Sequence, residues 1–94
     1  MGKIYYFMLA AVNSDDLKQI TSMADSSLNE SDGVVYIKEN NVVLGYVTFD
    51  ERREGDALKS VYVTSVQTTR SEDVDVLIDY IKEVFENQDL EIIT

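Results

Sequence analysis

The chain has 94 residues, of which 18 are acidic and 8 are basic, and it contains neither histidine nor cysteine, so its formal net charge at pH 7 is −10. We expect residues 1–94 to form a single domain, because this length fits one compact core. The missing cysteines exclude disulfides and thiolate chemistry, and the missing histidines remove the commonest general base at neutral pH. The negative charge repels nucleic acid and anionic membranes, and it attracts basic proteins.

The first third of the chain predicts one strand and one helix. Residues 3–9 are apolar and aromatic, and we interpret them as a buried strand and not as a signal peptide, which indicates a cytoplasmic protein. Ser14 is the expected N-cap of a helix over about residues 15–28. Four apolar residues recur there at helical spacing: Leu17, Ile20, Ala24 and Leu28.

Three strands joined by hairpins are predicted in the middle of the chain. Residues 34–39 and 42–49 are apolar segments on either side of Asn40 and Asn41, a pair typical of tight hairpins. Residues 50–56 form a charged connection, and 57–66 alternate well enough for a third strand.

A second helix and a short strand complete the pattern. Residues 67–71 are a polar turn, 72–87 have an apolar face at helical spacing, and 89–93 form a closing strand. The order β-α-β-β-β-α-β predicts an α+β fold in which two helices cover a mainly antiparallel sheet.

Two local patterns resemble the GNAT family of acyl-CoA N-acyltransferases, whose core has this order of elements. Residues 44–47 (Leu-Gly-Tyr-Val) are similar to a strand of that family. The segment 61–63 (Val-Tyr-Val), followed by 70–75 (Arg-Ser-Glu-Asp-Val-Asp), resembles the strand, phosphate loop and helix of its coenzyme A site. The resemblance implies a truncated GNAT core.

The phosphate loop departs from the family pattern R-x-x-G-x-G. Asp73 and Asp75 stand at the two glycine positions, and Glu72 adds a third acid. Glycines there let backbone N–H groups approach a pyrophosphate at a helix N-terminus, whereas carboxylates repel it. We therefore expect no coenzyme A binding and no cofactor. In the alternative, a degenerate GNAT-like acyl-CoA-binding domain, Arg70 is the best remaining phosphate contact.

The second predicted helix carries an acidic stripe, interrupted only by Lys82. Its charges recur about every 5–6 Å, close to the phosphate spacing along one nucleic-acid strand, over roughly 20 Å. Like charges at this spacing destabilise a helix, so folding alone does not favour them; an ordinary solvated face is the competing interpretation. The stripe consists of Glu72, Asp75, Asp79, Glu83 and Glu86.

The charged connection adds four further acids, partly neutralised by Arg52 and Arg53. These acids are Asp50, Glu51, Glu54 and Asp56. We expect no metal site, because Asp73, Asp75 and Asp79 lie on a predicted helix and not in the turning loop that calcium sites use.

In size and charge the chain is similar to phage-encoded acidic inhibitors of the bacterial nucleoid protein HU. This similarity implies a non-enzymatic DNA mimic that binds a basic, HU-like protein in the host cytoplasm or nucleoid and blocks its DNA binding. We predict that the chain is not an enzyme, has no catalytic residues, binds neither nucleic acid nor membrane, and can form a homodimer through a sheet edge. The nine acids of the stripe and the connection are the predicted contacts. A plain acidic interaction or dimerisation module is the other alternative.

Overall fold

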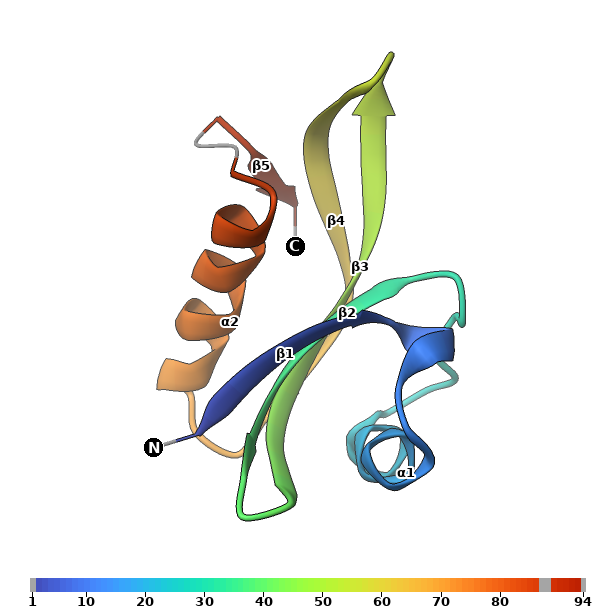
Figure 1. Cartoon of the computed structure of the whole chain (residues 1–94), viewed down its shortest axis with the longest axis vertical. Helices are drawn as coiled ribbons and strands as arrows, with labels where there is room; N and C mark the ends of the chain where they lie inside the picture. Colours follow the sequence, from blue (N-terminus) through green and yellow to red (C-terminus); the bar gives the residue numbers. More distant parts are fainter. Residues whose placement is uncertain (1, 87–88, 94) are drawn as a thin grey trace.

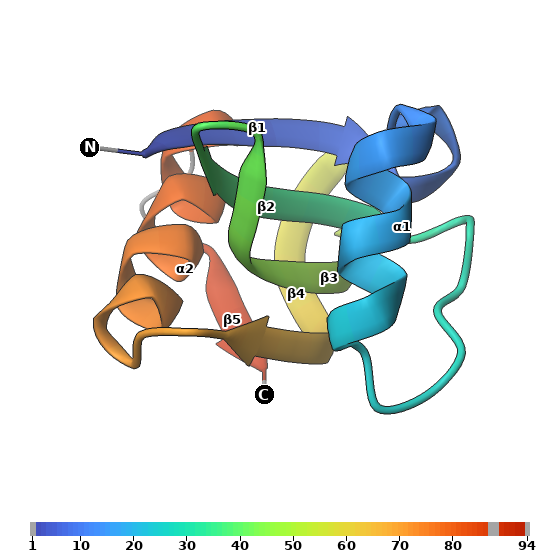
Figure 2. The same ribbon diagram turned by 90° about the horizontal axis from the view of Figure 1, so that it is seen from below.

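A five-stranded sheet with a helix packed on each face forms the computed structural model, which describes residues 2–86 and 89–93 (Figures 1 and 2). The elements are β1 (Lys3–Met8), the 3-10 helix η1 (Leu9–Ala11), α1 (Ser14–Met23), β2 (Gly33–Glu39), β3 (Val42–Glu54), β4 (Ala57–Thr68), α2 (Glu72–Val84) and β5 (Glu91–Ile93).

The strands lie in chain order across the sheet, from β1 at one edge to β5 at the other. The pairs β1–β2, β2–β3 and β3–β4 are antiparallel, whereas β5 runs parallel to β4 because α2 connects them. This arrangement confirms the predicted α+β class and order of elements.

The centre of the sheet is buried on both faces. Along β2, Val35 and Ile37 belong to the core cluster under α2, while Val34 and Tyr36 belong to the cluster under α1. Because successive side chains of a strand point to opposite faces, a strand with four consecutive buried residues requires cover on both sides. The two helices provide that cover, each with its own apolar face.

The two hairpins differ in how well the sequence predicted them. Asn40 and Asn41 both have positive φ, 52° and 67°, as a tight two-residue turn requires, so this hairpin is confirmed. The predicted connection over 50–56 is wrong, because β3 continues to Glu54 and pairs with β4 as far as Ala57. The turn is confined to Gly55, at φ 64°, and Asp56. Charged side chains on an exposed strand leave its backbone ladder intact.

The first helix is shorter than predicted and has a different cap. Asn13, not Ser14, is the N-cap, since its side chain accepts a hydrogen bond from the backbone N–H of Asp16. The helix ends at Met23, yet Ala24 and Leu28 still pack against the cluster beneath it. The spacing of Ala24 and Leu28 therefore predicted correctly that both residues are buried in part, but not that they belong to the helix.

The elements at the two ends of the chain also differ from the predictions. The strand predicted as buried over 3–9 is the edge strand β1, on which Phe7 and Met8 are exposed. The helix predicted to residue 87 ends at Val84, and residue 87 itself lies outside the described residues. β5 begins at Glu91 and not at residue 89.

A buried carboxylate ties α1 to the sheet. Asp16 is 3% exposed; it accepts hydrogen bonds from the Tyr36 hydroxyl (2.7 Å) and the Asn13 amide (2.9 Å), and it pairs with Lys38 Nζ at 2.8 Å. Burial alone raises the pKa of Asp16, but the hydrogen bonds from Lys38, Tyr36 and Asn13 outweigh it and lower the pKa below its usual 3.8.

This lowered pKa predicts acid-sensitive stability. Asp16 stabilises the fold above its unfolded-state pKa, and the contribution is lost as pH falls through the lower folded-state value. Asp16→Asn should therefore lower the free energy of unfolding by at least about 1 kcal/mol at neutral pH, and by less below about pH 3. Urea unfolding at both pH values measures the difference.

Asp15→Asn is the matched control, because it removes the same charge from the exposed neighbouring residue. It corrects for the general relief of charge repulsion on acidification. A deficit in Asp16→Asn that stays constant between the two pH values would show that the charge of Asp16 does not stabilise the fold.

Candidate acidic interface

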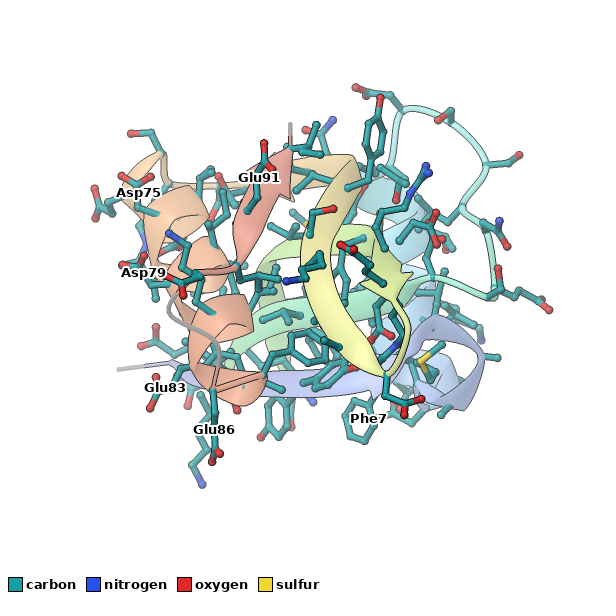
Figure 3. All side chains as sticks on the ribbon, turned by 90° about the horizontal axis from the view of Figure 1, so that it is seen from above. Phe7, Asp75, Asp79, Glu83, Glu86 and Glu91 are labelled. Carbon is teal, nitrogen blue, oxygen red and sulfur yellow. The ribbon has the colours of Figure 1, made fainter. Side chains whose placement is uncertain are left out.

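Helix α2 separates its apolar and acidic residues around its circumference. Leu77 and Ile81 are fully buried against the sheet, whereas Glu72, Asp75, Asp79 and Glu83 are exposed on the helix. Glu86, predicted as the fifth residue of the stripe, is exposed too, but it lies beyond the end of α2 with φ 50°, so its place on the helix was predicted wrongly. At about 100° per residue, positions three or four apart share one side of a helix, so the stripe follows from the sequence spacing. Figure 3 shows Asp75, Asp79 and Glu83 projecting outward from this helix, and Glu86 beyond its C-terminal end.

The acids of the stripe do not take part in the ion pairs found within the described residues. Among the described residues, none of Glu72, Asp75, Asp79, Glu83 and Glu86 is joined to a basic side chain by an ion pair. The observed ion pairs use Lys38, Arg52, Arg53 and Arg70, none of which lies within α2. The outer face of α2 is consequently a strongly negative surface.

The four acids predicted in the connection lie on the projecting β3–β4 hairpin and behave differently from one another. Asp50 pairs with Arg52 at 3.4 Å, and Glu51 pairs with Arg53 at 2.9 Å while accepting a long hydrogen bond from the Tyr6 hydroxyl. The remaining two, Glu54 and Asp56, are exposed at the hairpin tip. The acids of α2 thus share one surface. Two of the hairpin acids form ion pairs with neighbouring arginines, and the other two lie at the exposed tip.

Glu91 is an exposed acid that the sequence analysis did not select. It lies on β5, opposite Ser60 of β4, and Figure 3 shows it on the side of the molecule that also displays Asp75 and Asp79. No local pattern signals this placement, since it depends on the parallel pairing of two strands that are distant in sequence.

Two other acids escaped the sequence analysis because they are buried. Asp32 is 5% exposed and accepts a hydrogen bond from Thr64 at 2.7 Å, and Thr64 is in turn bonded to Thr48. Thr64 stands at a bulge in β4, where the pairing shifts between Thr48 and Phe49 of β3. Asp16 is the second, and its pattern with Asn13, a cap followed three residues later by an acid, was the only available signal.

The first turn of α2 has a buried carboxylate, Asp73, in the segment 70–75 that resembles the family's phosphate loop. Asp73 is 3% exposed and receives two hydrogen bonds from the Arg70 guanidinium, at 3.1 and 3.3 Å. The hydrogen bond from Arg70 to Asp73 raises the pKa of Arg70. These contacts disfavour a coenzyme A pyrophosphate at this segment, because Asp73 occupies the Arg70 guanidinium and adds a buried negative charge at the start of α2.

Neither a metal site nor a membrane-spanning helix is found within the described residues. No group of three acidic side chains within residues 2–86 and 89–93 converges closely enough to hold a metal ion. No helix there has both the length and the apolar character needed to cross a membrane.

Comparison with known proteins places this fold among acetyltransferases. No family model and no curated protein matches the chain. A ribosomal-protein-alanine N-acetyltransferase from Brucella melitensis biovar Abortus 2308 matches 99% of this chain and 80% of its own, with a TM-score of 0.64 and 14% identity. A GNAT-family acetyltransferase from Streptococcus pneumoniae TIGR4 matches 100% and 76%, with a TM-score of 0.50 and 14% identity.

The chain therefore has a GNAT-like α+β fold, as the sequence resemblance implied. The same comparisons contradict the prediction that the chain is not an enzyme, because both neighbours are acetyltransferases. The predicted likeness to HU inhibitors receives no support from either neighbour and stays a prediction.

The Arg70–Asp73 pair generates a prediction about acyl-CoA affinity. Asp73→Gly introduces the glycine that the GNAT pattern has at this position, frees Arg70 and removes a carboxylate from the helix N-terminus. Affinity for acetyl-CoA should rise by at least roughly tenfold, or about 1.4 kcal/mol. Isothermal titration measures it, with a thermal melt to verify that the variant is folded.

The control for this measurement is Glu72→Gln, which removes the same charge from the exposed preceding residue. Its effect on acetyl-CoA affinity should be less than about threefold. Equal affinities for a folded Asp73→Gly variant and the unaltered chain would mean that Asp73 does not block an acyl-CoA site.

Proposed function

We propose that this chain binds a basic DNA-binding protein through the outer face of α2 and occupies the surface that this protein uses to hold the DNA backbone. One observation carries the proposal: four exposed carboxylates of α2, Glu72, Asp75, Asp79 and Glu83, follow one side of the helix, and Glu86 lies just beyond its end. None of the five has an ion-pair partner among the described residues. A cationic surface that fits a row of phosphates fits such a row of carboxylates by the same electrostatics.

The energetics of the stripe suit binding better than folding. Repulsion between acids three and four residues apart destabilises α2, and Glu83 lies at the negative end of the helix dipole. A basic partner converts this repulsion into attraction across the interface. Because the stripe is exposed, little desolvation is needed before contact, and the long-range field accelerates the encounter.

The distribution of positive charge separates this proposal from a role in solubility alone. Arg52 and Arg53 pair with acids on the hairpin, and Lys38 and Arg70 pair with buried ones, whereas no ion pair within the described residues includes a stripe acid, although Lys82 lies in the same helix. Solubility requires only net charge and does not favour any one face. Glu54 and Asp56 at the hairpin tip extend the acidic surface beyond the helix.

Acyl-CoA binding is the second candidate function, and the specific observation in its favour is the acetyltransferase fold of both structural neighbours. Isothermal titration of the unaltered chain with acetyl-CoA, the reference measurement for Asp73→Gly, tests it. The two candidate functions overlap at the start of α2, because Glu72 and Asp75 belong both to the segment 70–75 and to the acidic stripe, whereas Asp79 and Glu83 belong to the stripe alone.

The stripe proposal predicts a localised, salt-dependent effect. With HU as the basic probe, the chain should displace labelled duplex DNA, and Asp75→Asn with Asp79→Asn should weaken this displacement by at least roughly tenfold at about 50 mM salt. The loss should be smaller at about 300 mM salt, because screening already removes part of the attraction. Fluorescence anisotropy of the DNA measures the competition.

Asp15→Asn with Glu30→Gln is the matched control, since both residues are exposed and the change in net charge is identical. We expect this variant to compete within about threefold of the unaltered chain. Equal weakening in the two double variants would indicate a response to net charge alone and would contradict a defined interface on α2.

A further inference from the structure

The free edge of β1 presents hydrogen-bonding groups that the sheet leaves unused. Residues of β1 and β2 pair such that Tyr5 faces Tyr36, and Leu9 N–H donates to Asp32 O at 2.9 Å in the same register. Because hydrogen-bonded and non-bonded pairs alternate in an antiparallel ladder, the odd-numbered residues bond to β2. The N–H and C=O groups of Ile4, Tyr6 and Met8 therefore point away from the sheet.

This edge lacks the usual protection against strand pairing. Exposed edges are normally blunted by charges, proline or bulges, but β1 has a single charge, Lys3 at its start, and a regular register with β2. Phe7 is 39% exposed and Met8 is 47% exposed at its far end. An edge of this kind is suited to pairing with another strand.

A groove of about 600 Å³ runs between this edge and α2, and its lining is aromatic on one side and acidic on the other. Tyr6 and Tyr80 contribute aromatic rings, and Glu83 and Glu86 contribute carboxylates. Lys82 lies about 160° around the helix from Tyr80 and Val84, so its charge is directed elsewhere. Figure 3 shows Glu83 and Glu86 on the side of α2 that adjoins β1.

We propose that β1 and this groove accept an extended segment of a basic protein, which adds to the sheet as a sixth strand. The backbone of that segment would bond to the outward groups of Ile4, Tyr6 and Met8, in the manner of β-augmentation. Its side chains on the α2 face are arginine or lysine, which stack on Tyr80 and pair with Glu83 and Glu86. Its intervening side chains are apolar and pack beside Phe7.

Charge selects this occupant over a second copy of the chain. Two copies paired through β1 would each carry a net charge of −10, and their Glu83 and Glu86 side chains would flank the same junction. Salt screens repulsion as well as attraction. Pairing between copies would therefore strengthen with salt, whereas binding of a basic segment weakens.

This inference goes beyond the stripe proposal: it shares Glu83 and Glu86 with the stripe but adds the edge of β1, and the two tests use different residues. The stripe test changes Asp75 and Asp79, which do not line the groove. A loss of DNA displacement in that variant leaves strand addition intact, and a failure of strand addition leaves the stripe proposal intact.

The test measures how tightly a short peptide of alternating arginine and valine binds to this chain. The binding is compared between the unaltered chain and its Met8→Pro and Met8→Ala variants. Met8 has φ −69° and ψ 141°, which proline adopts without strain, and its N–H points outward, so Met8→Pro removes one edge donor without breaking the β1–β2 ladder. Peptide affinity should fall at least roughly tenfold in Met8→Pro and less than about threefold in Met8→Ala.

Charge and backbone readouts complete the experiment. Glu83→Gln with Glu86→Gln should weaken peptide binding at least roughly tenfold at low salt, and a peptide of alternating glutamate and valine should not bind. Hydrogen exchange followed by NMR should show new protection at the N–H groups of Ile4 and Tyr6 on peptide binding, with Tyr5 unchanged.

Three results would overturn the proposal. Equal peptide affinity in Met8→Pro and Met8→Ala would place the peptide away from the edge, and an affinity unaffected by Glu83→Gln with Glu86→Gln would remove the charge selection. A dimer in analytical ultracentrifugation that strengthens with salt and dissociates in Met8→Pro would show that a second copy covers β1.

Discussion

The need to bury both faces of the central strands governs the architecture of this molecule. Four consecutive residues of β2, from Val34 to Ile37, are almost inaccessible, and β3 repeats the pattern from Gly45 to Phe49. Because their side chains alternate, one face requires α1 and the other α2. Both helices therefore pack against the middle of the sheet, and no further helix within the described residues covers β1 at its edge. Because one side of each helix packs against the sheet, the other side faces solvent, and on α2 that side has the acidic residues.

The distribution of charge follows from this burial. Four of the eight basic side chains, Lys38, Arg52, Arg53 and Arg70, form the observed ion pairs with acids on the sheet, the hairpin or the buried ends of the helices. Two of these acids, Asp16 and Asp73, are buried, and a buried carboxylate without a cation is far more costly than an exposed one. Burial accounts for the pairs of Lys38 and Arg70, whereas Arg52 and Arg53 pair with their neighbours on the exposed hairpin. Within the described residues no ion pair includes a stripe acid, so the outer face of α2 keeps an excess of negative charge despite Lys82.

The parts of the structure that were predictable from the sequence are those determined by local periodicity. The order of elements, the Asn40–Asn41 turn and the exposure of the stripe all follow from spacing along one strand or helix. Most of the errors share another cause, because they depend on partners distant in sequence. Asp16, for example, is held by Tyr36 and Lys38. The cap of α1 is an exception, because Asn13 replaces Ser14 through a local bond to the N–H of Asp16, three residues away. β3 extends to Glu54 because it pairs with β4 over that length. Asp32 is buried and accepts a hydrogen bond from Thr64, which lies 32 residues further along the chain. The prediction against enzymatic function came from residue types that the chain lacks, and such an argument is insensitive to the fold that proved to be shared with acetyltransferases.

The N-terminus of α2 shows how a change of a few side chains reverses the kind of ligand that one fold attracts. A helix N-terminus has a partial positive charge and favours anions. In this chain Glu72, Asp73 and Asp75 place three carboxylates within the first turn, so the helix satisfies that preference internally. Asp73 also neutralises Arg70, the nearest cation to the loop. The exposed acids Glu72 and Asp75 add a negative charge that no ion pair within the described residues balances, and Asp79 and Glu83 extend this charge along the helix. A position that would attract a phosphate with glycines therefore presents a negative field, and the ligand that this field favours is a cation.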